Sequence, residues 1–133
     1  MMTSRSSGKQ VQGVTDFLAL MDAWPESWAG VRADIALGQR LVEKMQAFII
    51  HLHDQGLSRK TVRRHLDNLW CIGGEIIRDV NYDDSLRRKQ PGELLLRSVE
   101  LGEAPLLNNS DETQQRSCDA TARKLLRFLS EQS

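Results

Sequence analysis

The stretch that decides the fold of this chain is residues 55–66, which read Gln55-Gly56-Leu57-Ser58-Arg59-Lys60-Thr61-Val62-Arg63-Arg64-His65-Leu66. Glycine readily adopts the left-handed conformation that often follows the last turn of a helix. Serine is a good N-cap for a new helix. The stretch therefore predicts that one helix ends at Gly56, that a tight turn follows, and that a second helix begins after Ser58.

Apolar residues on both sides of this turn recur at three- and four-residue spacing, which is typical of helices that bury one face. The first helix is expected from about Asp34 to Gly56, with a stripe of Leu37, Leu41, Val42, Met45, Phe48, Ile49 and Leu52. The second carries Val62, Leu66, Leu69, Trp70, Gly73, Ile76, Ile77 and Val80. Because a short turn makes the stripes face each other, part of both should be buried together. That part is Phe48, Leu52, Val62, Leu66, Leu69 and Trp70.

Shorter elements are expected around this pair. A short amphipathic helix should run from Val14 to Trp24, ended by Pro25, with a connection at residues 26–30. Residues 81–90 are polar and predict a loop. Residues 91–101 are compatible with a helix that begins at Pro91, although their three consecutive leucines could also form a strand.

A last helix should be capped by Asn109 or Ser110 and bury one stripe. The members of that stripe are Cys118, Ala122, Leu125, Leu126 and Leu129. Residues 1–12 are poor in apolar side chains and predict a disordered tail. The expected fold is thus all-α: one helical domain over residues 13–133, arranged as an irregular or orthogonal bundle of about five helices.

Composition limits the function. The 18 basic and 18 acidic side chains give a formal net charge of zero, whereas non-specific nucleic-acid binders usually have a basic excess. No apolar run approaches the ~20 residues of a membrane span, so no membrane association is expected. The two cysteines form no CxxC pair, which favours a reducing, cytoplasmic location.

The turn is locally basic, because Arg59, Lys60, Arg63 and Arg64 lie within eight positions that contain no acid. Arg59 and Lys60 fall in the first helical turn, where the helix dipole disfavours positive charge. Such a broken rule often marks either strain or a functional position. Together with the Ser58 hydroxyl and free backbone N–H groups, these cations could hold the phosphates of duplex DNA. The alternative is an ordinary solvated helix face.

The same residues could instead form a helix-turn-helix, with residues 61–69 reading the major groove. The helix expected before the turn is long and unbroken, whereas that motif usually has a short one.

Residues 45–80 also resemble the core-binding domain of tyrosine recombinases and phage integrases. The residues that carry the resemblance are Phe48-Ile49-Ile50-His51-Leu52, Gln55-Gly56-Leu57-Ser58, Thr61-Val62-Arg63-Arg64-His65-Leu66, Leu69 and Ile72. The resemblance implies a small helical bundle that clamps one side of a DNA duplex through a helix that is basic at its start.

The chain departs from that family in its catalytic residues. The only tyrosine is Tyr82, and no histidine is followed three residues later by arginine. About fifty residues follow Val80, whereas the family's catalytic domain is much longer. The resemblance therefore implies a non-enzymatic relative of the DNA-binding half.

Other chemistry finds little support in the sequence. His51 and His53 are two residues apart and would point to different helix faces, and His65, Cys71 and Cys118 are scattered. Residues 79–90 begin like a calcium loop but lack its glycine and its final glutamate. We therefore expect no metal, no cofactor and no catalytic residue.

A second function remains open: a helical protein–protein interaction domain or a small dimer. Trp24 and Trp28 flank Pro25 and could either cover the end of the bundle or present an apolar patch to a partner. The zero net charge favours this function, whereas the basic cluster and the resemblance favour DNA binding. Gly73 and Gly74 in the second long helix indicate either close approach of another element or a kink.

Overall fold

The computed structural model describes residues 13–107 and 111–132, and all regular structure within these ranges is helical. The elements are α2 (Thr15–Met21), α3 (Trp24–Trp28), α4 (Ala33–Asp54), α5 (Arg59–Tyr82), a 3-10 helix η1 (Asp84–Arg88), α6 (Pro91–Val99) and α7 (Glu112–Gln132). The predicted all-α class is confirmed. The predicted disordered tail at residues 1–12 and the predicted cap at Asn109 or Ser110 lie outside the described residues.

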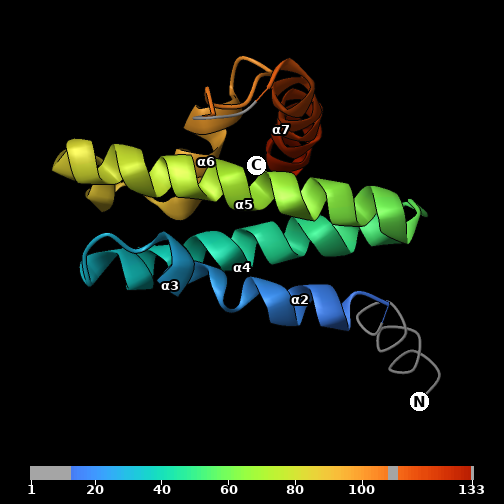
Figure 1. Ribbon diagram of the computed structural model, residues 1–133, viewed down its shortest axis with the longest axis horizontal. Coiled ribbons are helices and arrows are strands. Elements are labelled where there is room, and N and C mark those ends of the chain that lie inside the picture. Colours follow the sequence, from blue (N-terminus) through green and yellow to red (C-terminus); the bar gives the residue numbers. More distant parts are fainter. Residues whose placement is uncertain (1–12, 108–110, 133) are drawn as a thin grey trace.

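The two longest helices form the centre of the molecule. Figure 1 shows α4 and α5 side by side along the long axis, with α2 and α3 on one side of the pair and α6 and α7 on the other. The last helix, α7, is seen nearly end-on, so it crosses the pair instead of running along it. The arrangement is the irregular, partly orthogonal bundle that the sequence predicted.

The turn between α4 and α5 forms as its sequence indicates. Gly56 has a φ of 85°, in the left-handed region, and follows the end of α4. Ser58 caps α5, because its hydroxyl oxygen accepts a hydrogen bond from the backbone N–H of Thr61 at 3.2 Å. These two residues set the reversal that brings the apolar stripes of the long helices together.

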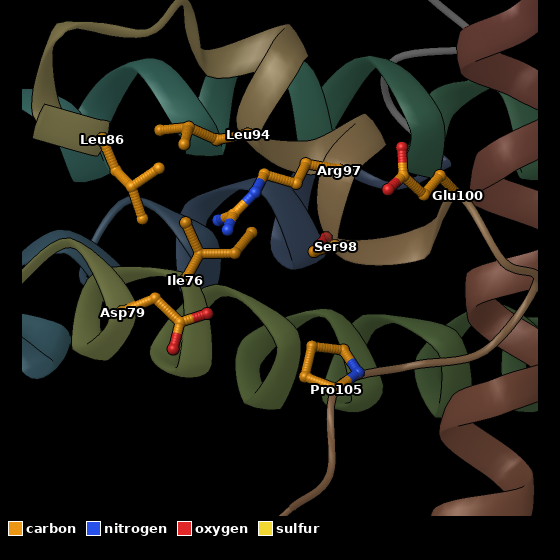
Figure 2. Close-up of a pocket in the computed structure, with 8 residues that line it drawn as sticks. All are labelled: Ile76, Asp79, Leu86, Leu94, Arg97, Ser98, Glu100 and Pro105. Carbon is orange, nitrogen blue, oxygen red and sulfur yellow. The ribbon is translucent and has the colours of Figure 1, made fainter. Parts of the chain in front are cut away.

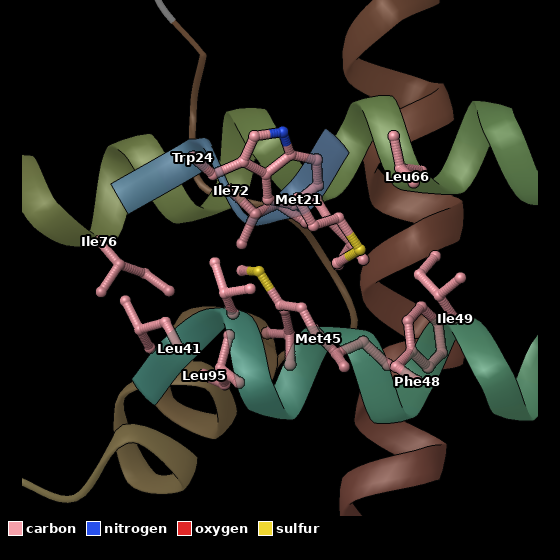
Figure 3. Packing of buried hydrophobic residues seen from close by; sticks show 14 of the residues in the cluster. Met21, Trp24, Leu41, Met45, Phe48, Ile49, Leu66, Ile72, Ile76 and Leu95 are labelled. Atoms are coloured by element: carbon pink, nitrogen blue, oxygen red, sulfur yellow. The ribbon is translucent and has the colours of Figure 1, made fainter. Parts of the chain in front are cut away.

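The core lies where those stripes meet and where the shorter helices close over them. Figure 3 shows Met45 and Phe48 of α4 facing Ile72 of α5, with Met21 and Leu95 contributed by other helices. Of the six residues predicted to be buried together, five are buried. They are Phe48, Leu52, Val62, Leu66 and Leu69.

The prediction that Trp70 is a core residue is wrong, because its side chain is 45 % exposed. Trp28 of α3 occupies the neighbouring space instead, and its indole N–H donates to the backbone carbonyl of Trp70 at 3.0 Å. Trp24 is buried, and Trp28 is half-buried against the core with its ring centroid 5.7 Å from that of Trp24. These two tryptophans therefore cover the central helix pair.

Two segment boundaries also differ from the prediction. Pro25 does not end the N-terminal helix but lies in the first turn of a further helix, α3. Proline is tolerated there because a residue in the first turn donates no backbone hydrogen bond within the helix. Residues 81–90 are more regular than a loop, since α5 continues to Tyr82 and η1 follows at once.

The C-terminal third packs through two helices. Residues 91–99 form a helix, which resolves the ambiguity between helix and strand, and Gly102 beyond it has a φ of 75°. On α7, Cys118, Ala122 and Leu125 are buried as predicted, whereas Leu126 and Leu129 are partly buried. Phe128, which the predicted stripe omitted, packs with its ring centroid 5.6 Å from that of Phe48. None of the described helices combines the length and the apolar character that a membrane span requires.

Candidate nucleic-acid interface

The site predicted from sequence lies at the start of α5, beginning with its cap. Ser58 accepts from the Thr61 N–H through its side chain and from the Val62 N–H through its carbonyl, at 3.2 and 2.9 Å. Its hydroxyl also donates to Thr61 Oγ1 at 3.0 Å. Ser58 is therefore engaged in building the helix start, and an anion would compete with it for those donors.

Arg59 has partners within the chain, far away in sequence. Its guanidinium donates to the backbone carbonyl of Gly13 at 2.8 Å and forms an ion pair with Asp16. It also lies 4.3 Å from the centroid of the Phe17 ring, in cation–π geometry. The hydrogen bond from Arg59 is the largest cause that lowers the pKa of the Asp16 carboxyl. Arg59 thus ties the start of α2 to the start of α5, which gives its unfavourable place in the dipole a structural explanation.

The remaining three candidates point to solvent. Lys60, Arg63 and Arg64 are all exposed, and we call them the basic face. Arg63 forms an ion pair with Asp67 at 3.1 Å, but both side chains are more than half exposed, so the pair holds Arg63 weakly. Within the part of the chain that the structure describes, no ion pair joins Lys60 or Arg64 to an acid. The first turn of α5 contains no acidic residue.

His65 directly follows Arg64 in sequence but does not belong to the basic face. Its side chain is fully buried, and Nδ1 lies 2.6 Å from the hydroxyl of Thr121 on α7. Burial, followed by the positive charges of Arg64 and Lys124, lowers the pKa of His65 to about 4. The ring is therefore neutral at physiological pH. The sequence contains a signal for the burial of His65, because this residue is three positions after Val62 and four before Leu69 on the buried stripe.

A row of polar side chains that sequence reasoning missed joins α5 to α7. The Asn68 amide donates to Ser117 Oγ at 3.0 Å and to Thr121 Oγ1 at 2.9 Å. The Cys118 thiol donates to the side-chain oxygen Oδ1 of Asn68 at 3.3 Å. This polar seam, consisting of His65, Asn68, Cys118 and Thr121, fixes α7 against the α5 segment that also carries the basic face.

The helix-turn-helix alternative gains no support from this geometry. The helix before the turn, α4, is 22 residues long. Within residues 61–69, the side chains of Val62, His65, Leu66, Asn68 and Leu69 are buried in the bundle. Too few side chains of this segment remain free to read bases in a major groove.

A hollow of about 320 Å³ lies between α5, η1 and α6. Figure 2 shows Arg97 reaching from α6 into this space, with Asp79 of α5 and Glu100 also at its edge. Because both signs of charge line it, the hollow does not extend the basic face as a track for phosphates. Among the described residues, no three His, Cys, Asp or Glu side chains are grouped as a metal site would need.

No family model, curated protein or solved structure matches this chain. The likeness of residues 45–80 to the recombinase core-binding domain therefore depends on the sequence features alone.

Proposed function

We propose that this protein is a non-enzymatic DNA-binding module that holds duplex DNA by its phosphates through the basic face, Lys60, Arg63 and Arg64. The observation that carries the proposal is the arrangement of these three exposed cations over the first two turns of α5. Lys60 lies in the first turn, at the positive end of the helix dipole, and that turn contains no acid; Arg63 and Arg64 follow in the next turn. A bound phosphate would relieve that unfavourable concentration of positive charge.

The other two residues nominated from the sequence have supporting roles in this proposal. Ser58 caps α5 and Arg59 anchors α2, so both hold the helix start in place. The Arg63–Asp67 pair is exposed and of the kind that contributes ~0–1 kcal/mol, so Arg63 can exchange this acid for a phosphate at little cost.

The expected binding mode is weak and independent of sequence. Phosphate contacts carry no direct sequence information, and a chain of zero net charge has little long-range attraction for DNA. The dissociation constant should therefore be near the ~10⁻⁴–10⁻⁶ M of non-specific binding at physiological salt. The resemblance to integrase core-binding domains supports the same mode, and the two free cysteines support a cytoplasmic location.

A matched pair of charge reversals tests the proposal. Lys60→Glu with Arg64→Glu removes two cations that are four residues apart at the start of α5. Arg40→Glu with Lys44→Glu makes the same change of charge and spacing on exposed residues of α4. The α5 variant should bind a duplex at least about tenfold more weakly than wild type at low salt, whereas the α4 variant should lose much less. Equal losses in both would show that net charge, and not the basic face, determines binding.

A second candidate, self-association, is favoured by the exposed Trp70. Its indole N–H donates to Ser27 Oγ at 3.0 Å, which fixes the ring at the surface. Trp70 lines two hollows, of about 450 and 220 Å³, and Leu20 and Trp24 also line the larger one. A fixed, exposed tryptophan is typical of a contact residue, and zero net charge gives two copies no repulsion.

Sedimentation equilibrium of wild type and of Trp70→Gln tests this candidate. A dimer in wild type that becomes a monomer in the variant would support it. A monomer at all protein concentrations would exclude it.

A further inference from the structure

The only two cysteines of the chain meet across a helix crossing. Cys71 lies on α5 and Cys118 lies on α7, and each thiol shifts the pKa of the other, so the two side chains are neighbours. Cys118 is fully buried, and its single S–H donates at 3.3 Å to Oδ1 of Asn68, which lies one helical turn before Cys71 on α5. The polar seam thus holds the Cys118 sulfur against the face of α5 that carries Cys71.

The two thiols differ in access. Cys71 is half-buried and lines both hollows beside Trp70, of about 450 and 220 Å³. Either hollow is much larger than a small oxidant such as hydrogen peroxide. Cys118 is enclosed by the bundle, so a reagent from solvent reaches Cys71 first.

The two thiols also differ in acidity, and the more accessible one, Cys71, is the more acidic. A hydrogen bond from the Cys118 thiol, whose single proton can turn from Asn68 to a Cys71 thiolate, is the largest influence on Cys71 and lowers its pKa, while burial and the carboxylates Asp67 and Glu75 act in the opposite direction. The same hydrogen bond, with burial, raises the pKa of Cys118. Cys71 is therefore the thiol that ionises, and the thiolate is the nucleophilic form.

We propose that Cys71 and Cys118 are a hydroperoxide-sensitive thiol pair, in which Cys71 is oxidised first and Cys118 then converts it to a disulfide that joins α5 to α7. Neither cysteine belongs to the basic face, although Arg63 lines the larger hollow, and the proposal does not depend on DNA binding.

The chemistry has two steps. The Cys71 thiolate attacks one oxygen of the hydroperoxide, so that an S–O bond forms, the O–O bond breaks, and the other oxygen takes a proton and leaves as water or an alcohol. Cys71 is then a sulfenic acid. The Cys118 sulfur attacks the Cys71 sulfur, an S–S bond forms, the S–O bond breaks, and the hydroxide leaves as water with the proton from Cys118. The two thiols lose two electrons in total and the hydroperoxide gains them.

Peptide mapping of the intact protein tests the proposal directly. Folded protein is treated with hydrogen peroxide at neutral pH, its free thiols are blocked with N-ethylmaleimide, and it is digested with trypsin without reduction. Because trypsin cuts after Arg64, Arg78, Arg116 and Arg123, the expected product is the peptide 65–78 joined to the peptide 117–123. This linked peptide should be lost on reduction with dithiothreitol.

Two variants assign the order of the steps. Cys118→Ser should stop at a sulfenic acid on Cys71, which dimedone traps. Cys71→Ser should leave Cys118 reduced, because Cys118 is buried. Circular dichroism establishes that each variant is folded before it is used.

Three outcomes in wild type would overturn the proposal, and none needs a variant. The first is a sulfinic or sulfonic acid on Cys71 with Cys118 still free. The second is a disulfide between two chains through Cys71. The third is two reduced thiols at peroxide concentrations that oxidise a free cysteine.

Discussion

Gly73 of α5 packs so closely against the indole of Trp28 that a methyl group at its Cα would overlap ring carbons Cζ2 and Cη2. The adjacent Gly74 has room, since a methyl group there would be 3.5 Å from Trp28 Cδ1. Of the two explanations that the sequence offers for this glycine pair, close approach applies at Gly73. The approaching group is a tryptophan side chain that is also held by its hydrogen bond to the Trp70 carbonyl.

Alanine substitutions at these two glycines should therefore have opposite effects on stability. Gly73→Ala should lower the free energy of unfolding, because overpacking costs ~1–3 kcal/mol and exceeds the gain in helix propensity. Gly74→Ala should raise it by ~0.5–1 kcal/mol, since alanine stabilises a helix interior where space allows. Urea unfolding of both variants checks this. Two changes of the same sign would show that Trp28 does not occupy the place described.

The buried carboxylate of Asp34 should be a major determinant of stability. It accepts hydrogen bonds from Gly30 N, Val31 N, Asn81 Nδ2 and Arg87 Nη1, at 2.8, 3.0, 2.9 and 2.8 Å. Burial raises the pKa of Asp34, but these bonds together outweigh burial and lower the pKa to about 2.

Asp34→Ala should lower the free energy of unfolding by ~3–5 kcal/mol, because it leaves the partly buried Arg87 and two backbone donors without their acceptor. Asp84, the exposed partner of the same arginine, provides a matched control. Asp84→Ala should change stability by no more than ~0.5 kcal/mol. Similar losses in the two variants, measured by urea unfolding, would contradict the role assigned to Asp34.

The buried histidine should make stability depend on pH. In the unfolded chain His65 takes up a proton as pH falls through about 6.5, whereas in the folded chain its pKa is about 4. The unfolded state then binds more protons in between, so the stability linked to His65 is complete above pH 6.5 and is lost as pH falls toward 4. The loss should approach ~3 kcal/mol.

The difference between wild type and His65→Gln isolates this effect from other titrating groups. Glutamine can keep a polar contact with Thr121 but does not titrate. The wild-type free energy of unfolding should fall more steeply between pH 7 and pH 4.5 than that of the variant. Parallel curves would mean that His65 is protonated in the folded protein or is not buried.

Charge reversal at Arg59 and at Lys60 should have opposite effects on stability, because Arg59 has partners within the fold and Lys60 points to solvent. Lys60→Glu should raise the free energy of unfolding by ~0.3–1 kcal/mol, because it places a negative charge in the first turn of α5. Arg59→Glu should lower the melting temperature instead, since it removes the bonds to Gly13 and Asp16 and places two acids together. Thermal unfolding of the two variants decides. A gain in stability at both positions would show that Arg59 does not anchor α2.

Features of the fold that depend on interactions between residues close in sequence could be predicted, whereas features that depend on contacts between distant segments could not. The α4–α5 pair could be predicted because its signals, Gly56 and Ser58, act within one turn of themselves. The prediction that Trp70 is buried was wrong, because helical spacing indicates which side of a helix faces the core but not which residue of another element packs there. Here that residue is Trp28.

The candidate site divides in the same way. Exposure of Lys60, Arg63 and Arg64 follows from their positions opposite the apolar stripe. The engagement of Arg59 could not be predicted, since its partner Asp16 is 43 positions away and nothing local indicates it. The burial of His65 could have been predicted, because helical periodicity places it on the buried side of α5.

The central claim is that the basic face binds DNA phosphates, and the salt dependence of duplex binding tests it most directly. Each neutralised phosphate releases counterion, so three contacts should give a slope of log K against log salt concentration of about −3. Lys60→Glu with Arg64→Glu should weaken binding and reduce the slope to about −1, since one cation of the face remains. Wild-type protein with no affinity for duplex DNA at low salt, or a double variant with an unchanged slope, would contradict the account.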